Sequence, residues 1–240
     1  MKLWKGLPTV IFGTGSTSKE VVDFIDDINN QNHENVFDVL GYVSESKKEI
    51  GTVLNKKEII TWDETFKSFA KNFPLLGVII PFGKVEIKMN ILKKIQLSNN
   101  IVFPNIIHPK AILNKDRVHI GIGNIIYPGV VCTSDIHIGN FNTINMNVTI
   151  GHDVKIGNYN VINPVTAISG NVLLENEISI GTGSSIAQGI KIGEKAFIAM
   201  GSAVIENVEK GEQVSGNFAT DHRNNLKKYM EKKLKRQTNK

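Results

Sequence analysis

One histidine of the chain is followed directly by a carboxylate and precedes a glycine by eighteen residues. The histidine lies in Ile150-Gly151-His152-Asp153 and the glycine in Gly170-Asn171. A carboxylate beside an imidazole orients the ring and stabilises its protonated form, which is the minimal arrangement for a general base. An accessible glycine N–H can bind a developing oxyanion. We therefore predict a catalytic site if the fold brings the two segments together; the alternative is an ordinary His–Asp pair in a surface turn.

A strict period of six residues predicts that the two segments do meet. Every sixth residue from Ile120 to Val204 is apolar, and twelve of these fifteen are isoleucine. Neither an α-helix nor an ordinary strand has this period. Hexapeptide repeats build a parallel β-helix, in which three short strands form one coil of eighteen residues. Residues eighteen apart are then about 4.8 Å apart on neighbouring coils. Glycine repeats at the coil period, with one interruption by Glu175, at Gly121, Gly139, Gly157 and Gly193.

The only cysteine occupies a position of the apolar ladder. Cys132 replaces isoleucine there, so we expect a buried and unreactive thiol. A single cysteine excludes an intramolecular disulfide and suits the reducing cytoplasm.

The first hundred residues follow a different pattern, in which apolar runs alternate with amphipathic segments. The apolar runs predict strands at residues 9–12, 37–43, 58–62 and 75–81, and the amphipathic segments predict helices after residue 17 and at 63–72 and 84–99. Alternating strands and helices indicate a small parallel α/β sheet.

The turn after the first strand reads Gly13-Thr14-Gly15-Ser16-Thr17-Ser18. Glycines at this position let backbone N–H groups approach a phosphate at the start of the following helix. Thr17 and Glu20 have the spacing of a capping box. Ser18 stands where a dinucleotide fingerprint has its third glycine, and the domain is short, so a sugar nucleotide fits better than NAD. The alternative is a tight turn that binds no ligand.

The other histidines do not suggest a metal site. His119 and His137 are eighteen apart and share an outward-facing column that continues as Lys155, Leu173 and Lys191, without a third ligand. The sequence suggests no partner for the remaining three, which are His33, His108 and His222.

Charge is concentrated at the end of the chain. The net charge is +5, and residues 221–240 carry eight Lys or Arg against two acidic residues. We interpret this tail as a solvated helix; attraction of CoA phosphates or of an anionic membrane surface is the alternative. Nucleic acid is not an expected partner, because the basic residues lack interleaved aromatics. There is no apolar run long enough to span a membrane and no signal-peptide pattern.

Together these motifs resemble the hexapeptide-repeat sugar acyltransferases, in the bacterial branch that joins a small Rossmann-like sugar-nucleotide domain to a left-handed β-helix. This branch includes N-acetyltransferases for nucleotide-linked 4-amino-sugars of the bacillosamine and perosamine types, and sialic acid O-acetyltransferases. The resemblance extends over residues 11–18, Ile107-His108-Pro109, the repeats and Gly216-Asn217. Its most specific motif is Asn145 with residues 150–153 and Gly170-Asn171.

The resemblance implies a homotrimer with acetyl-CoA in the groove between two β-helices. His152 would be the general base, Asp153 its partner and the Gly170 N–H the oxyanion donor. Family members line the pantetheine channel at the positions of Thr182, Ala199, Met200 and Gly201. Asn145 would lie on the acceptor side. The nucleotide phosphates would meet Gly13, Gly15, Ser16 and Thr17.

Several positions depart from the family pattern. Some relatives carry a second histidine where Val161 stands, and the glycine-rich turn often has histidine and further glycine where Ser16, Thr17 and Ser18 occur. Paired aspartates often follow the second strand, where this chain has Ser44-Glu45, and Phe218 replaces a usual proline. These departures bear on the identity of the nucleotide sugar more than on acyl transfer.

We therefore expect a Rossmann-like sugar-nucleotide domain at residues 1–104, a left-handed β-helix acyltransferase domain at 105–211 and a basic helical tail at 212–240. The expected function is transfer of an acetyl group from acetyl-CoA to the amino group of a nucleotide-linked sugar, in the cytoplasm and without a metal. Sialic acid O-acetylation is the closest alternative. A zinc hydratase on the same β-helix and a non-catalytic scaffold are the others.

Overall fold

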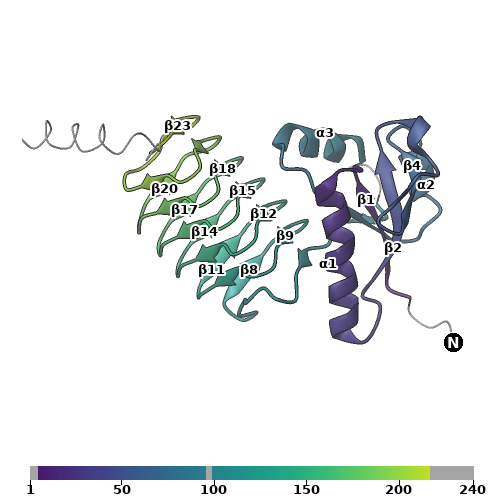
Figure 1. Cartoon of the computed structure of the whole chain (residues 1–240), viewed down its shortest axis with the longest axis horizontal. Helices are drawn as coiled ribbons and strands as arrows, with labels where there is room; N and C mark the ends of the chain where they lie inside the picture. The colour runs from purple at the N-terminus through teal and green to yellow at the C-terminus, as the bar shows by residue number, and fades with distance from the viewer. Residues whose placement is uncertain (1–4, 96–98, 217–240) are drawn as a thin grey trace, which may run out of the picture.

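The computed structural model describes residues 5–95 and 99–216, and it consists of an α/β layer followed by a stack of short strands (Figure 1). The basic tail predicted beyond residue 216 lies outside the described residues. Within the described part, no helix is both long and apolar enough to cross a membrane.

The α/β layer is a six-stranded sheet in the order β3-β4-β2-β1-β5-β6, in which β3 pairs antiparallel with β4 and the other pairs are parallel. Its strands are β1 (Leu7–Phe12), β2 (Phe37–Ser44), β3 (Val53–Leu54), β4 (Lys57–Trp62), β5 (Leu76–Ile79) and β6 (Ile101–Val102). The sequence predicted the four longer strands and missed the two-residue strands β3 and β6. The chain order reverses between β1 and β5, where doubly wound sheets bind ligands at the carboxyl ends of their strands.

Helices cover both faces of this sheet. They are α1 (Ser16–Asn32), α2 (Phe66–Ala70) and α3 (Val85–Ile95), with a short 3-10 helix, η1 (Lys47–Glu49). The α1 residues Val21, Ile25 and Ile28 belong to a core that also contains Ile125 and Tyr127 of the coils. Thus α1 lies between the sheet and the coils (Figure 1), whereas α2 and α3 pack in a second core that also contains Phe141 of the coils. Both are shorter than the predicted helices; residues 96–98 of the second prediction are not described.

Three parallel sheets form the walls of the coil stack. The first coil sheet contains β7 (Ile106–Ile107), β9 (Ile125–Ile126), β12 (Thr143–Ile144), β15 (Val161–Ile162), β18 (Ser179–Ile180), β21 (Phe197–Ile198) and β23 (Gln213–Val214). The second contains β10 (Val131–Cys132), β13 (Thr149–Ile150), β16 (Ala167–Ile168), β19 (Ser185–Ile186) and β22 (Ala203–Val204). The third contains β8 (Val118–Ile120), β11 (Ile136–Ile138), β14 (Lys155–Ile156), β17 (Leu173–Leu174) and β20 (Lys191–Ile192).

Strand registers confirm the coil of eighteen residues. Ile144 pairs with Ile162 and Ile162 with Ile180, and the same step recurs in the other two sheets. This arrangement of repeated parallel strands fits a left-handed β-helix. The α/β sheet ends at Val102 and the first coil strand begins at Ile106, while β23 extends the coils to Val214, past residue 211.

The ladder residues fill the interior of the coils. Cys132 is 4% exposed within this core, and burial raises the pKa of its thiol to about 12. The glycine column lets the backbones of neighbouring coils approach closely, because a Cβ at Gly139 would lie 2.5 Å from the carbonyl oxygen of Gly157 on the next coil. Corner residues at intervals of six have positive φ, and the non-glycine members are Asp135, Phe141, Asn147, Asp153, Tyr159, Val165, Asn171, Glu177 and Lys195.

A buried asparagine ladder, which we did not predict, supports the corner between the third and first coil sheets. Asn124, Asn142 and Asn160 are fully buried, and each side-chain oxygen accepts the backbone N–H of the residue one coil further on. Their side-chain amides also bind carbonyl groups across the corner, at distances of 2.9 Å. These bonds satisfy polar backbone groups that the stacked turns would otherwise bury unpaired.

Candidate active site

His152 and Asp153 occupy the corner between β13 and β14, which we call the His152 corner (residues 151–154 and their repeats one coil away). Their side chains are 53% and 54% exposed, and His152 Nδ1 lies 2.8 Å from Asp153 Oδ2. Asp153 reaches this position with a φ of 59°, the left-handed conformation that recurs at the coil corners. Because the carboxylate engages Nδ1, the Nε2 atom remains available to accept a proton.

Gly170 lies directly beneath the imidazole, as the coil period predicted. A Cβ built on Gly170 would lie 2.6 Å from His152 Nε2 and 2.7 Å from Cε1, so only glycine allows this position of the ring. Gly170 is buried, and its backbone N–H has no acceptor among residues 5–95 and 99–216. The structure thus brings together His152, Asp153 and Gly170.

A surface pocket of about 470 Å³ opens beside this corner. It is lined by Asp135, His137, Asp153, Lys155, Asn171, Val172 and Leu173. Arg117 forms an ion pair with Asp135 and holds the pKa of that carboxyl below its usual value. The rings of His137 and His119 lie side by side on neighbouring coils, tilted by 43° with centroids 4.9 Å apart. The corner therefore carries charges of both signs, with the free edge of His152 facing solvent.

The residues expected to bind acetyl-CoA lie at a different corner. Asn145 begins the corner between the first and second coil sheets, and Thr182, Ala199, Met200 and Gly201 lie two and three coils further along it. We call this edge the Asn145 corner (residues 145–148 and their repeats). Gly201 N donates to the carbonyl of Thr182 at 2.9 Å, and Met200 is 72% exposed. Within one chain, the second coil sheet separates these residues from His152.

The glycine turn lies at the start of α1, at the carboxyl end of β1. Gly15 is the N-cap with an extended backbone and without a side-chain cap, so the capping box predicted from Thr17 and Glu20 is wrong. The helix begins two residues earlier than predicted, at Ser16, and Glu20 instead accepts a hydrogen bond from Tyr127. The backbone N–H groups of Gly15, Ser16 and Thr17 have no acceptor in the described part of the chain.

Two further positions of this turn have structural reasons. A Cβ on Gly13 would lie 2.6 Å from the ring of Phe82, which follows β5. Ser18 is 3% exposed, and its hydroxyl donates to the carbonyl of Phe12 at 3.2 Å. A small residue with an internal hydrogen bond therefore fits where a dinucleotide fingerprint has its third glycine. Gly15 has open space around it, since a Cβ there would meet nothing within 4 Å.

Side-chain contacts fix α1 against the coils, and the sequence did not reveal them. Tyr127 Oη donates to Glu20 at 3.2 Å, and His108 Nε2 lies 3.0 Å from Asp27. The ring of Phe24 packs edge-on against both Tyr127 and His108. His108 is thus a buried contact between the two parts of the fold. No sequence spacing links residues of α1 to residues a hundred positions later.

Metal ligands do not gather in the described ranges. In residues 5–95 and 99–216, no group of three or more His, Cys, Asp or Glu side chains could hold a metal ion. The stacked pair His119 and His137 remains without a third ligand there.

Solved structures share this fold. PerB from Caulobacter crescentus, in complex with CoA and GDP-perosamine, is 21% identical with a TM-score of 0.75, over 87% of this chain and 94% of PerB. The acetyltransferase domain of PglB from Neisseria gonorrhoeae, in complex with acetyl coenzyme A, is 20% identical with a TM-score of 0.75, over 90% of this chain and 98% of the PglB domain. WeeI from Acinetobacter baumannii is 25% identical with a TM-score of 0.71, over 89% and 99%.

The comparison confirms the predicted resemblance at the level of the fold. The matches extend over the α/β layer as well as the coils, since they cover nearly all of each compared chain. No protein-family model and no curated protein matches the sequence.

Proposed function

We propose that the protein is an acetyl-CoA-dependent sugar N-acetyltransferase that acts on a nucleotide-linked amino-sugar, most specifically a 4-amino-4,6-dideoxy sugar. The observation that carries this proposal is the close approach of Gly170 to the imidazole of His152, which Asp153 orients, together with a Gly170 N–H that has no acceptor in the described part of the chain. A base beside an oxyanion donor is the pair of groups that direct acyl transfer needs. The complexes of PerB with GDP-perosamine and of PglB with acetyl coenzyme A support the two substrates.

In the proposed reaction, His152 Nε2 removes a proton as the sugar amine attacks the thioester carbonyl carbon. The C–N bond forms, and the oxygen of the tetrahedral intermediate accepts a hydrogen bond from the Gly170 N–H. The C–S bond then breaks, and the proton held by His152 passes to the departing CoA thiolate. Asp153 stabilises the imidazolium between these two proton transfers.

The acetyl-CoA groove would lie between two copies of the chain in a homotrimer. Within a single chain, His152 lies one coil sheet away from the residues expected to bind acetyl-CoA, which are Thr182, Ala199, Met200 and Gly201. The second coil sheet presents small side chains to solvent between the two corners, at Thr149, Ala167, Ser185 and Ala203. A flat face of small residues suits close packing around a threefold axis, which would set the His152 corner of one copy against the Asn145 corner of the next.

The acceptor would bind at the start of α1. The unpaired N–H groups of Gly15, Ser16 and Thr17, with the positive end of a 17-residue helix, suit a diphosphate. Gly13 permits the close approach of Phe82, and Asn145 would meet the sugar. The buried single cysteine is compatible with a cytoplasmic enzyme of surface-polysaccharide synthesis.

A substitution at Gly15 tests the acceptor class. Gly15→Val fits sterically, because a Cβ there has no neighbour within 4 Å and φ is −77°. We expect it to abolish binding of UDP-, GDP- and dTDP-linked amino-sugars in isothermal titration and to leave acetyl-CoA affinity unchanged. Release of CoA with each sugar then identifies the acceptor. If only unactivated sialic acid is acetylated, then the O-acetyltransferase alternative is correct and the turn is structural.

A further inference from the structure

A buried lysine lies between the α/β layer and the coils without a counter-ion. Lys88 of α3 is 2% exposed, and its Nζ donates a hydrogen bond of 2.7 Å to the backbone carbonyl of Phe141. An ammonium group has three N–H donors, and no carboxylate in the described residues forms an ion pair with Lys88. Burial lowers the pKa of Lys88 to about 8. A buried cation with one neutral partner is costly until an anion joins it.

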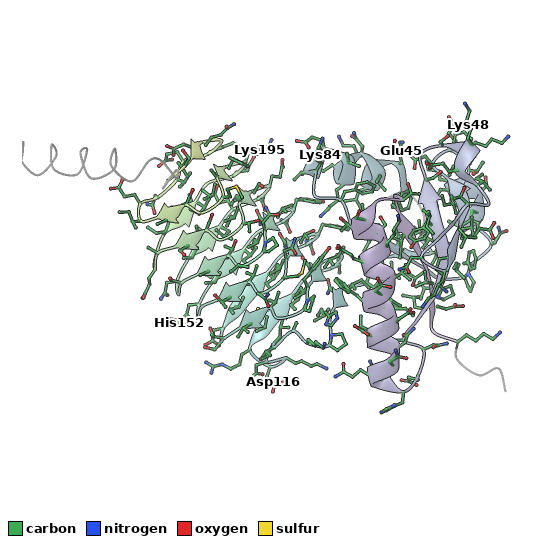
Figure 2. All side chains as sticks on the ribbon, viewed as in Figure 1. Glu45, Lys48, Lys84, Asp116, His152 and Lys195 are labelled. Carbon is green, nitrogen blue, oxygen red and sulfur yellow. The ribbon has the colours of Figure 1, made fainter. Side chains whose placement is uncertain are left out.

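Lys88 lies on the helix that follows the carboxyl end of β5, and its ammonium bonds to the coils at Phe141. Helix α3 begins at Val85, shortly after β5 ends, and long helical side chains lean toward the N-terminus of their helix. The turn after β1 is adjacent, since Gly13 contacts the ring of Phe82. The start of α1 and helix α3 lie at the same upper edge in Figure 1, and Lys84, just before α3, is labelled there in Figure 2. This edge, at the reversal between β1 and β5, is where such sheets bind ligands.

A second buried polar group, on β12, has no hydrogen-bond partner among the described residues. Thr143 is 6% exposed, and its Oγ1 has no hydrogen-bond partner in the described part of the chain. It lies two residues after Phe141 and one coil beyond Ile125, which packs in one core with Ile11 and Ile79 of β1 and β5. Buried hydroxyl groups are normally paired, so the unpaired Thr143 and the underpaired Lys88 point to an absent ligand.

The other ionisable groups near α3 do not explain Lys88. Lys84, just before α3, and Lys93 on α3 are exposed cations, and the exposed Lys94 pairs with Asp63. The carboxylates Glu86 and Glu177 line a different pocket together with Lys195. Tyr159, at the coil corner beside Phe141, has its pKa raised by burial and by Glu177, so it is neutral.

We propose that Lys88 and Thr143 form the second half of the acceptor site, with the Lys88 ammonium binding the diphosphate of a nucleotide sugar opposite the start of α1. Thr143 Oγ1 donates a hydrogen bond to the same ligand. The inference rests on the proposed function, and it adds the cation that two phosphate charges require in a buried site. We favour a diphosphate over a lone carboxylate, because in the described part of the chain the N–H groups of the helix terminus have no acceptor and the ammonium has no counter-ion.

Proton uptake on binding tests this assignment. Burial lowers the pKa of Lys88 to about 8 and an anion beside the ammonium raises that pKa, so we expect a fractional uptake of protons at pH 8 when the ligand binds. Titration calorimetry with GDP-mannose, UDP-GlcNAc and dTDP-glucose, in Tris and in HEPES, measures this uptake. None of these probes carries an amine that titrates near pH 8. At pH 6.5 Lys88 is already protonated, so we expect the Lys88 contribution to disappear.

Three variants separate binding from structure. Lys88→Met should remove the uptake and weaken binding at least tenfold, whereas Lys93→Met, at an exposed position of the same helix, should behave as the wild type. Thr143→Val should weaken binding several-fold while the unfolding midpoint stays equal or rises, because an unpaired buried hydroxyl is removed. This second variant keeps the test decisive if Lys88→Met folds poorly.

The outcomes distinguish the two proposals. If Lys88→Met binds the probes with unchanged proton uptake, or Thr143→Val binds them as tightly as the wild type, then these residues only join α3 to the coils. The proposed function would then still stand. If no sugar nucleotide binds to a wild-type protein that binds acetyl-CoA, then the acceptor class is wrong and the assignment of Lys88 falls with it.

Discussion

His152 is the residue on which the proposed chemistry depends. We expect His152→Ala to lower kcat by about 10²–10⁴, the usual effect of losing a general base. Stability should not change, because the side chain is 53% exposed and makes its one side-chain hydrogen bond to the equally exposed Asp153. Asp153→Asn should lower kcat by a smaller factor than His152→Ala. Steady-state kinetics and thermal unfolding measure both. His119→Ala, two coils away, is the control, and full activity of His152→Ala would disprove the assignment.

Gly170 should be as sensitive as the base itself. Even the Cβ of alanine would lie 2.6 Å from His152 Nε2, so Gly170→Ala must displace the imidazole from above the backbone N–H. We expect a loss of kcat similar to that of His152→Ala in a protein that still folds. The effect acts through the ring, so adding Gly170→Ala to His152→Ala should cost nothing further. An additional tenfold loss in the double variant would show that Gly170 acts independently of His152.

The sequence was sufficient to predict that His152 and Gly170 meet, and it did not predict the surroundings of the proposed acceptor site. His152 and Gly170 are eighteen positions apart, and the coil period converts that number directly into contact. Lys88, Thr143 and Phe82 have no such relation, because their surroundings arise where the α/β layer docks on the coils. Docking depends on the shapes of two separate cores, which no local spacing encodes.

Among the structural elements, the asparagine ladder should contribute much of the stability of the coils. Asn142 is fully buried, and it bonds to Asn124 below and to Asn160 and Gly157 above. Asn142→Ala would leave the Asn160 N–H and the Gly157 carbonyl unpaired, which we expect to cost about 2–4 kcal/mol of unfolding free energy. Urea titration measures this cost. Asn90→Ala, on the exposed face of α3, should change the unfolding free energy by less than about 0.5 kcal/mol.

The sequence predicted the strands correctly where the period of six dominates. It failed at helix and strand ends that contacts with other parts of the fold determine. Each coil strand from β9 to β22 contains a ladder residue, because one inward side chain in six is enough to define the wall. The ladder asparagines 124, 142 and 160 also lie eighteen apart, so their spacing was a signal present in the sequence. The predicted capping box does not form at the start of α1, because the side chain of Glu20 accepts a hydrogen bond from Tyr127 of the coils instead. A strand of two residues outside the repeat, such as β3, is too short to show a pattern in the sequence.

At the scale of the whole molecule, the separation of the two corners predicts complementation between inactive copies. His152→Ala and Ala199→Trp should each be inactive, the second through a blocked pantetheine channel. Coexpressed at equal levels, random trimers should regain roughly a quarter of wild-type activity, since one groove in four pairs an intact His152 corner with an intact Ala199. Sedimentation analysis should give the mass of a trimer for both variants. No recovery in mixed trimers would place each active site within a single chain.

Because neighbouring coils pair in register, the stack of coils can be lengthened only by whole coils. Asn145 and Ala199 occupy the same corner and differ by 54 residues, which is three coils or about 14 Å. An insertion of eighteen residues would preserve the ladder, the corners and the asparagine bonds, and it would lengthen that interval by one strand spacing. An insertion of six or twelve residues would keep the ladder inward but shift the corners to other columns, and an insertion that is not a multiple of six would turn the apolar ladder away from the interior. The distance between the proposed acceptor site and the proposed CoA site can therefore be altered only in whole steps of about 4.8 Å. If the proposed function is correct, the fold then restricts which acyl donors and acceptors such a scaffold can join.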